Sequence, residues 1–88
     1  MHGAVVLGAS GLVGQRLQQR LANHPMFSVR ALAGSQRTAG MNPSDLPWGL
    51  EGQAPLLDLP PVLDVQDPGL VERLRDLGVS WAFSAVPS

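Results

Sequence analysis

The chain of 88 residues contains no cysteine and no lysine. The absence of cysteine excludes a disulfide framework, a cysteine metal site and a cysteine nucleophile within these residues. The cationic side chains are therefore six arginines, and together with seven acidic residues they give a formal net charge of −1. This balance offers no electrostatic basis for binding nucleic acid or an anionic membrane surface. We interpret the use of arginine alone as a coding bias.

Long apolar runs are also missing. No run approaches the ~20 residues that span a bilayer, and the apolar stretch at residues 5–7 is too short for a signal peptide. We therefore expect a soluble cytoplasmic protein without a membrane partner. The length is sufficient for one small domain, whose core is thin relative to its surface.

Three glycines organise the beginning of the chain. Gly8, Gly11 and Gly14 follow an apolar run at residues 4–7 and precede an amphipathic segment. A buried strand, a phosphate-binding turn and a helix have this sequence form, although the spacing Gly-x-x-Gly-x-x-Gly is a variant of the dinucleotide fingerprint. Gly8 would allow a sharp turn, Gly11 a close approach of a pyrophosphate, and Gly14 tight packing of the helix.

The start of that helix is the expected phosphate site. Its free N–H groups and positive dipole end would face the phosphates, and Ser10 could add a hydroxyl donor. The alternative is a glycine-rich turn that binds no ligand.

The remaining pattern alternates strands with helices. We expect strands at residues 3–8, 27–33, 62–65 and 79–86, and helices at residues 12–22 and 67–77. This order predicts an α/β fold, namely part of a Rossmann-type doubly wound parallel sheet with about four strands and two helices.

The first helix is amphipathic. Val13, Leu17 and Leu21 are four residues apart, so we expect them to face the sheet. Gln15 and Gln18 fall between these positions and are expected to face solvent.

The second helix has clear boundary signals. Asp67 is a typical N-cap and Gly78 a typical left-handed stop. We expect its buried stripe to contain Leu70, Val71, Leu74 and Leu77.

The segment after the second strand indicates which dinucleotide would bind. In an NAD-selective site an acidic residue near this position binds the ribose hydroxyls, but no aspartate or glutamate occurs between Met1 and Ser44. Arg37 could instead bind a 2′-phosphate through charge-assisted hydrogen bonds, with Ser35 and Thr38 as hydroxyl donors. The sequence therefore favours NADP over NAD. A solvated loop arginine is the alternative.

The last strand ends at Ser84 and Ala85. In a doubly wound sheet this end lies beside the glycine turn, so both residues are predicted cofactor contacts, with an ordinary strand end as the alternative. Residues 41–61 contain five prolines and no regular pattern. We expect Trp48 to anchor this loop on the domain surface.

Three stretches together resemble the N-terminal cofactor domain of aspartate-semialdehyde dehydrogenase, most closely its archaeal and fungal branch. They are residues 6–16, then His24-Pro25-Met26-Phe27 with Ser35-Gln36-Arg37-Thr38-Ala39-Gly40, and finally Phe83-Ser84-Ala85-Val86-Pro87-Ser88. The glycine motif is shared with many families, whereas the second pair is more specific. The resemblance covers nearly the whole chain and is weakest across residues 41–61.

The resemblance implies the reaction of that family. It reduces β-aspartyl phosphate to aspartate β-semialdehyde with NADPH and releases phosphate, on the route to lysine, threonine, methionine and diaminopimelate. Family members are homodimers or homotetramers that use a cysteine thiolate, a histidine and substrate-binding arginines. The family's cofactor contacts match Gly8, Ser10, Gly11, Leu12 and Val13 at the pyrophosphate, Ser35, Arg37 and Thr38 at the 2′-phosphate, and Ser84 and Ala85 near the nicotinamide.

The family's catalytic residues lie further along than Ser88, so none is assigned here. We expect residues 1–88 to be the NADP-binding part of a dehydrogenase, without its catalytic and dimerisation domain. N-acetyl-glutamyl-phosphate reductase shares the glycine turn but is disfavoured by the His-Pro-Met-Phe stretch. An atypical short-chain reductase would carry a Tyr-x-x-x-Lys helix downstream. A further alternative is a non-catalytic NADP-binding module. In that case the 88 residues alone would unfold cooperatively and bind NADPH.

Overall fold

The computed structural model describes residues 2–9, 11–46, 48–49 and 59–85. The elements, in chain order, are β1 (His2–Leu7), α1 (Leu12–Ala22), β2 (Phe27–Gly34), the short 3-10 helix η1 (Pro43–Asp45), β3 (Leu63–Asp64), α2 (Leu70–Asp76) and β4 (Val79–Ser84). Each expected strand and helix is present. β3 and β4 are shorter than predicted, and Val86 lies outside the described residues.

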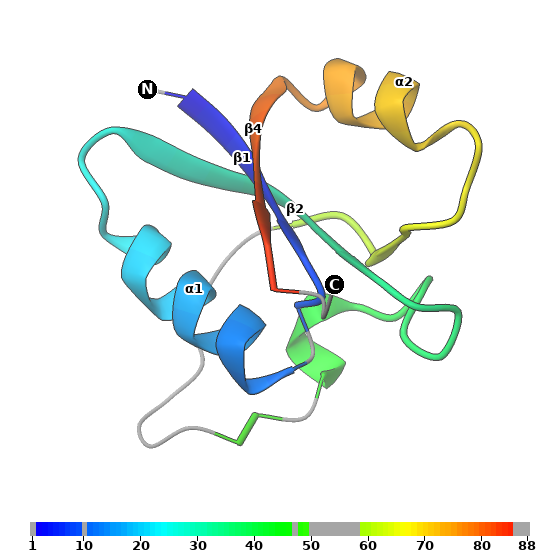
Figure 1. Cartoon of the computed structure of the whole chain (residues 1–88), viewed down its shortest axis with the longest axis horizontal. Helices are drawn as coiled ribbons and strands as arrows, with labels where there is room; N and C mark the ends of the chain where they lie inside the picture. The colour runs from blue at the N-terminus through cyan, green and yellow to red at the C-terminus, as the bar shows by residue number, and fades with distance from the viewer. Residues whose placement is uncertain (1, 10, 47, 50–58, 86–88) are drawn as a thin grey trace.

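The four strands form one parallel sheet in the order β3-β2-β1-β4. From β1 the chain proceeds outward to β3 and then crosses back to β4 on the other side of β1. Right-handed crossovers in opposite directions place their helices on opposite faces of a sheet, and Figure 1 shows α1 and α2 on the two sides. This arrangement confirms the predicted partial Rossmann-type fold.

The core lies on both faces of β1. Val5 and Val6 are fully buried because a central parallel strand is covered on each side. Val6 packs in the cluster that includes Leu21 of α1, and Val5 packs in the cluster that includes Leu74 of α2. The consecutive apolar residues of β1 therefore serve two separate clusters.

Helix α1 turns a different face to the sheet from the one that its spacing predicted. Gln15 and Gln18 were expected in solvent, but only 4% and 6% of their surface is exposed. Val13 was expected to face the sheet, but it is 64% exposed. Leu17 and Leu21 do pack against the core, as predicted.

Gly14 explains this rotation. A Cβ atom at Gly14 would overlap the carbonyl oxygen of Gly8 and lie 2.8 Å from the Cα of Ala9. The helix therefore comes closest to the rest of the fold along the face that contains Gly14. Gln18 lies one turn further along this face, which is why a polar side chain is buried there.

The N-cap of helix α2 lies two residues later than predicted, at Gly69 instead of Asp67. The N–H of Leu70 bonds to the carbonyl of Asp67 at 3.0 Å, and the N–H of Gly69 bonds to an Asp67 carboxylate oxygen at 2.9 Å. Asp67 therefore closes a turn that precedes the helix, and Gly69 is the N-cap.

The buried side of α2 is also narrower than predicted. Leu74 and Leu77 pack against the core, but Val71 is 61% exposed. Helix α2 has only seven residues, so it buries only a narrow apolar stripe against the sheet. Gly78 ends the helix with φ +78°, the left-handed conformation that was predicted. Neither helix in the described ranges is long and apolar enough to cross a membrane.

Candidate dinucleotide-binding site

The carboxyl ends of β1, β2 and β4 meet at one edge of the sheet (Figure 1). The N–H of Ala85, just after β4, bonds to the carbonyl of Leu7 at 2.9 Å. The N–H of Gly8, just after β1, bonds to the carbonyl of Ala33 at 2.9 Å. The strand order reverses between β1 and β4, and ligands of open α/β sheets bind in the crevice at such a reversal.

Two of the three glycines are required by the protein's own structure. Gly8 has φ +76°, which favours glycine over other residues. Gly14 has no space for a Cβ atom beside Gly8 and Ala9. Gly11 differs, because among the described residues its Cβ atom would meet only the Gly8 carbonyl oxygen, at an ordinary contact distance of 3.7 Å. The described part of the protein leaves room at Gly11, the position predicted to approach a pyrophosphate.

The first turn of α1 offers unpaired N–H groups. Gly11 is the N-cap, no side chain of a described residue caps it, and the turn contains no acidic residue. The first intrahelical bond runs from the N–H of Gln15 to the carbonyl of Gly11 at 2.9 Å. The N–H groups of Leu12 and Val13 therefore have no partner among the described residues. Such groups at the positive end of the helix dipole favour an anion.

The turn after β2 presents a cation. The N–H and hydroxyl of Thr38 both donate to the carbonyl of Ser35, at 3.0 and 3.3 Å, and so close the turn. A Cβ atom at Gly34 would overlap the Thr38 side chain, which explains the glycine before the turn. Arg37 is exposed and makes no hydrogen bond or ion pair with the residues that the structure describes. Its guanidinium is available to a ligand.

The other predicted contacts have the following positions. Ser84 is exposed at the end of β4, in register with Leu7, and Ala85 is half-buried beside it. Both residues therefore lie beside the end of β1, where the glycine turn begins. Ser10 lies outside the described residues.

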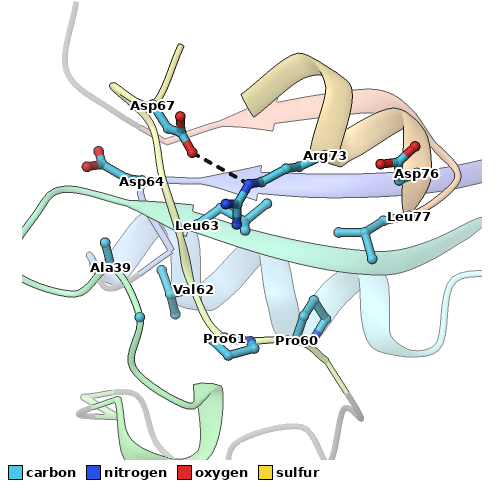
Figure 2. Close-up of a pocket in the computed structure, with 11 residues that line it drawn as sticks. Ala39, Pro60, Pro61, Val62, Leu63, Asp64, Asp67, Arg73, Asp76 and Leu77 are labelled. Atoms are coloured by element: carbon cyan, nitrogen blue, oxygen red, sulfur yellow. Dashed lines mark ion pairs between the residues drawn. The ribbon is translucent and has the colours of Figure 1, made fainter. Parts of the chain in front are cut away.

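A cavity of about 450 Å³ lies elsewhere, against α2. Figure 2 shows Arg73 extending from α2 toward Asp67, where the two side chains form an ion pair at 3.6 Å. The walls of the cavity also include Pro60, Val62 and Leu77. None of the predicted cofactor contacts among the described residues lines this cavity, and its wall at residues 39–40 adjoins the turn after β2.

Two residues near the glycine turn were assigned to solvent by the sequence pattern. The side-chain amide of Gln18 donates a hydrogen bond of 2.9 Å to the carbonyl of Ala9, inside the turn. The oxygen of the Gln15 side-chain amide accepts a hydrogen bond of 2.7 Å from the backbone N–H of Gly49. A signal was present in the sequence: Gln18 is four residues after a helical glycine and therefore on the same face.

Trp48 directly precedes Gly49, the residue that donates to Gln15. It is half-buried, and its indole nitrogen has no hydrogen-bond partner among the described residues. Its neighbour Gly49 lies against α1, because a Cβ atom there would be 3.1 Å from the Leu12 side chain. The expected anchoring of this loop on the domain surface is consistent with these contacts, although residues 47 and 50–58 lie outside the described part.

The fold and the site together define a dinucleotide-binding domain of the Rossmann class. An uncapped helix start lies at the strand-order reversal, and an available arginine follows the neighbouring strand. The sequence matches the family described as semialdehyde dehydrogenase, NAD binding domain, over residues 4–87. The chain belongs to this family.

Relatives of known activity agree with this assignment. Aspartate-semialdehyde dehydrogenase of Archaeoglobus fulgidus is 34% identical over 84 residues, which are 94% of this chain and 23% of that protein. The Saccharomyces cerevisiae enzyme is 57% identical over 37 residues, which are 42% of this chain and 10% of that protein.

A solved structure also agrees. The crystal structure of aspartate-semialdehyde dehydrogenase with NADP from Candida albicans superposes with a TM-score of 0.61 and 25% identity, covering 97% of this chain and 30% of that chain. The chain thus spans less than a third of the length of each of these proteins.

Proposed function

We propose that this chain is the NADP-binding part of an aspartate-semialdehyde dehydrogenase. The observation that carries the choice of NADP is the turn after β2, where Arg37 is exposed and has no partner among the described residues. No acidic residue stands near it in the sequence to bind a ribose hydroxyl. The Candida albicans relative was crystallised with NADP, which supports the same choice.

The residues present fit this cofactor. Backbone N–H groups of Leu12 and Val13, at the open side of Gly11, would hold the pyrophosphate. Arg37 would bind the 2′-phosphate with the hydroxyl of Ser35, while the Thr38 hydroxyl closes the turn that presents them. Ser84 and Ala85, beside the end of β1, would lie near the nicotinamide. When bound, the nicotinamide would supply a hydride, and these residues would bind and orient the cofactor.

The activity of the whole enzyme is proposed from the relatives. It would be the reduction of β-aspartyl phosphate to aspartate β-semialdehyde with release of phosphate, in the cytoplasm, by a homodimer or homotetramer. The product would enter the synthesis of lysine, threonine, methionine and diaminopimelate. The relatives named above are all aspartate-semialdehyde dehydrogenases, which favours this function over N-acetyl-glutamyl-phosphate reductase.

A titration of the 88-residue chain with NADPH and with NADH, followed by NMR, tests cofactor binding. We expect weak binding of NADPH, with shifts of the amide signals at residues 11–13 and 35–38. We expect NADH to bind about 10- to 100-fold more weakly, because one or two charge-assisted hydrogen bonds to the 2′-phosphate are lost. Equal affinities would contradict the preference for NADP. An absence of shifts at millimolar NADPH would contradict dinucleotide binding.

The catalytic proposal needs a separate test. Sequencing the gene past the Ser88 codon should reveal an open frame of ~250 residues that contains a cysteine and, later, a histidine. The protein that it encodes should oxidise aspartate β-semialdehyde with NADP in the presence of phosphate. A stop codon directly after Ser88 would contradict the catalytic proposal and leave the binding proposal unchanged.

A further inference from the structure

The buried face of α1 carries a polar side chain that contacts the glycine turn between β1 and α1. Gln18 is 6% exposed, and its amide nitrogen lies 2.9 Å from the carbonyl oxygen of Ala9. Ala9 itself is 1% exposed and lies between Gly8 and the start of the helix. A buried amide is unfavourable unless it is hydrogen-bonded. The amide N–H of Gln18 and the Ala9 carbonyl therefore satisfy each other where both residues are almost fully buried.

Gly14 makes this contact possible. Long side chains on a helix point back toward its N-terminus and cover the preceding turn of the same face. The preceding position on the face of Gln18 is Gly14, which has no side chain and lies against Ala9. The Gln18 side chain thus reaches over a bare stretch of helix to the turn.

The other hydrogen bonds of the turn show which of its groups are held by the protein. The N–H groups of Gly8 and Ala9 both point toward the carbonyl of Ala33, at 2.9 and 3.3 Å. The N–H of Gly11 bonds to the carbonyl of Gly8 at 3.2 Å. Gln18 supplies the one side-chain contact among these bonds, and it holds a carbonyl oxygen on the inner side of the turn.

We propose that Gln18 is a positioning residue for the pyrophosphate: by holding the Ala9 carbonyl inward, it keeps the phosphate side of the turn free of carbonyl oxygens. The inference rests on the proposed binding of NADP. The peptide that follows Ala9 has its carbonyl at one end and its N–H at the other. Loss of the Gln18 bond would leave the carbonyl buried and unpaired, which favours rotation of that peptide. The oxygen would then repel a phosphate at the helix start.

The substitution Gln18→Met tests the proposal. Methionine has a similar length and shape and a good helix propensity, but it donates no hydrogen bond. Gln19→Met is the matched control, because it makes the same change at the next position, on the more exposed side of α1. Each variant and the unchanged chain are titrated by NMR with NADPH and with adenosine 2′-monophosphate, which carries the 2′-phosphate but no pyrophosphate.

We expect Gln18→Met to weaken NADPH binding about tenfold, the ratio that corresponds to one lost hydrogen bond. Its affinity for adenosine 2′-monophosphate should change less than about twofold, since Arg37 and its turn do not contact Gln18. Gln19→Met should behave as the unchanged chain does with both ligands. The amide signals of residues 9–11 should move in Gln18→Met without ligand, because rotation of the peptide after Ala9 changes the surroundings of these N–H groups.

Two results would overturn the inference. An equal loss of affinity for both ligands, with a lowered unfolding midpoint, would show that Gln18 supports only the stability of the domain. Unchanged NADPH affinity together with unmoved amide signals would show that the Ala9 carbonyl does not depend on it. If the unchanged chain shows no shifts with NADPH, the proposed function itself is wrong, and the ligand-free spectra still report whether Gln18 holds the turn.

Discussion

The N–H of Ala85 donates a hydrogen bond of 2.9 Å to the carbonyl of Leu7. This bond joins the end of β4 to the end of β1 directly before the glycine turn. The strand-order reversal therefore brings the end of β4 beside the glycine turn. The two adjacent parallel strands hold the turn and Ser84 in a common register.

Gly14→Ala should destabilise the domain. Alanine is favoured over glycine in an exposed helix by about 1 kcal/mol, but here the added methyl group would overlap the Gly8 carbonyl. We expect the free energy of unfolding to fall by about 1–3 kcal/mol, as for other overpacked sites. Urea denaturation followed by circular dichroism measures it. An unchanged or raised stability would mean that helix and turn separate easily.

Gly11→Ala should have the opposite profile. The nearest described atom to its new methyl group would be the Gly8 carbonyl oxygen, at 3.7 Å, and φ at this residue is −75°. We expect the free energy of unfolding to fall by only about 0.5–1 kcal/mol, because alanine is a poorer N-cap than glycine but meets no steric overlap here. NADPH binding should weaken at least tenfold, because the methyl group would occupy the space in which we propose that the pyrophosphate binds. Retained NADPH affinity would place the phosphates elsewhere.

Arg37→Ala should change the choice of dinucleotide. The loss of a charge-assisted contact to the 2′-phosphate should weaken NADPH binding by about 1.5–3 kcal/mol and leave NADH binding nearly unchanged. Arg75→Ala is the matched control, since Arg75 is another exposed arginine but belongs to helix α2 and not to the turn after β2. Isothermal or NMR titration gives both affinities. A parallel loss for NADPH and NADH would contradict the role of Arg37.

Asp67→Ala and Arg73→Ala should differ in their effects on stability. Their ion pair is 3.6 Å long and its side chains are 65% exposed on Arg73 and 32% on Asp67, so the pair itself is worth less than about 0.5–1 kcal/mol. Asp67 also accepts the N–H of Gly69. We expect Asp67→Ala to cost about 1 kcal/mol and Arg73→Ala less than half as much, by urea denaturation. Equal costs would show that the ion pair dominates.

Much of the fold was predictable because its signals are local. The apolar run, the glycines and the amphipathic segment predicted β1, the turn and α1, and the bounds of α1 agree with the expectation. The left-handed stop at Gly78 was predicted because a conformation with positive φ favours glycine. The starts of short elements were less predictable, since Asp67 can cap a helix or close a turn before one with the same hydrogen bond.

Part of the chemistry of the candidate site could also be predicted from the residue types alone. The choice of NADP follows from Arg37 and from the lack of an acidic residue before Ser44, and neither depends on how the chain packs. The roles of Gly8 and Gly14 follow from steric limits on backbone conformation and approach. The assignment of individual contacts to the cofactor stays a prediction.

The tertiary structure alone decided which side of α1 is buried. The spacing of Val13, Leu17 and Leu21 predicts an apolar face, but neighbouring faces of a helix differ by a modest rotation. The close approach at Gly14 set that rotation, exposed Val13 and brought Gln18 to the carbonyl of Ala9. The helical glycine four residues before Gln18 indicates the shared face, but the contact itself also depends on the distance between two elements, which no pattern within one element specifies. The sequence by itself determined the order of the elements and the residue types predicted to bind the ligand, and packing determined which polar side chain contacts the turn.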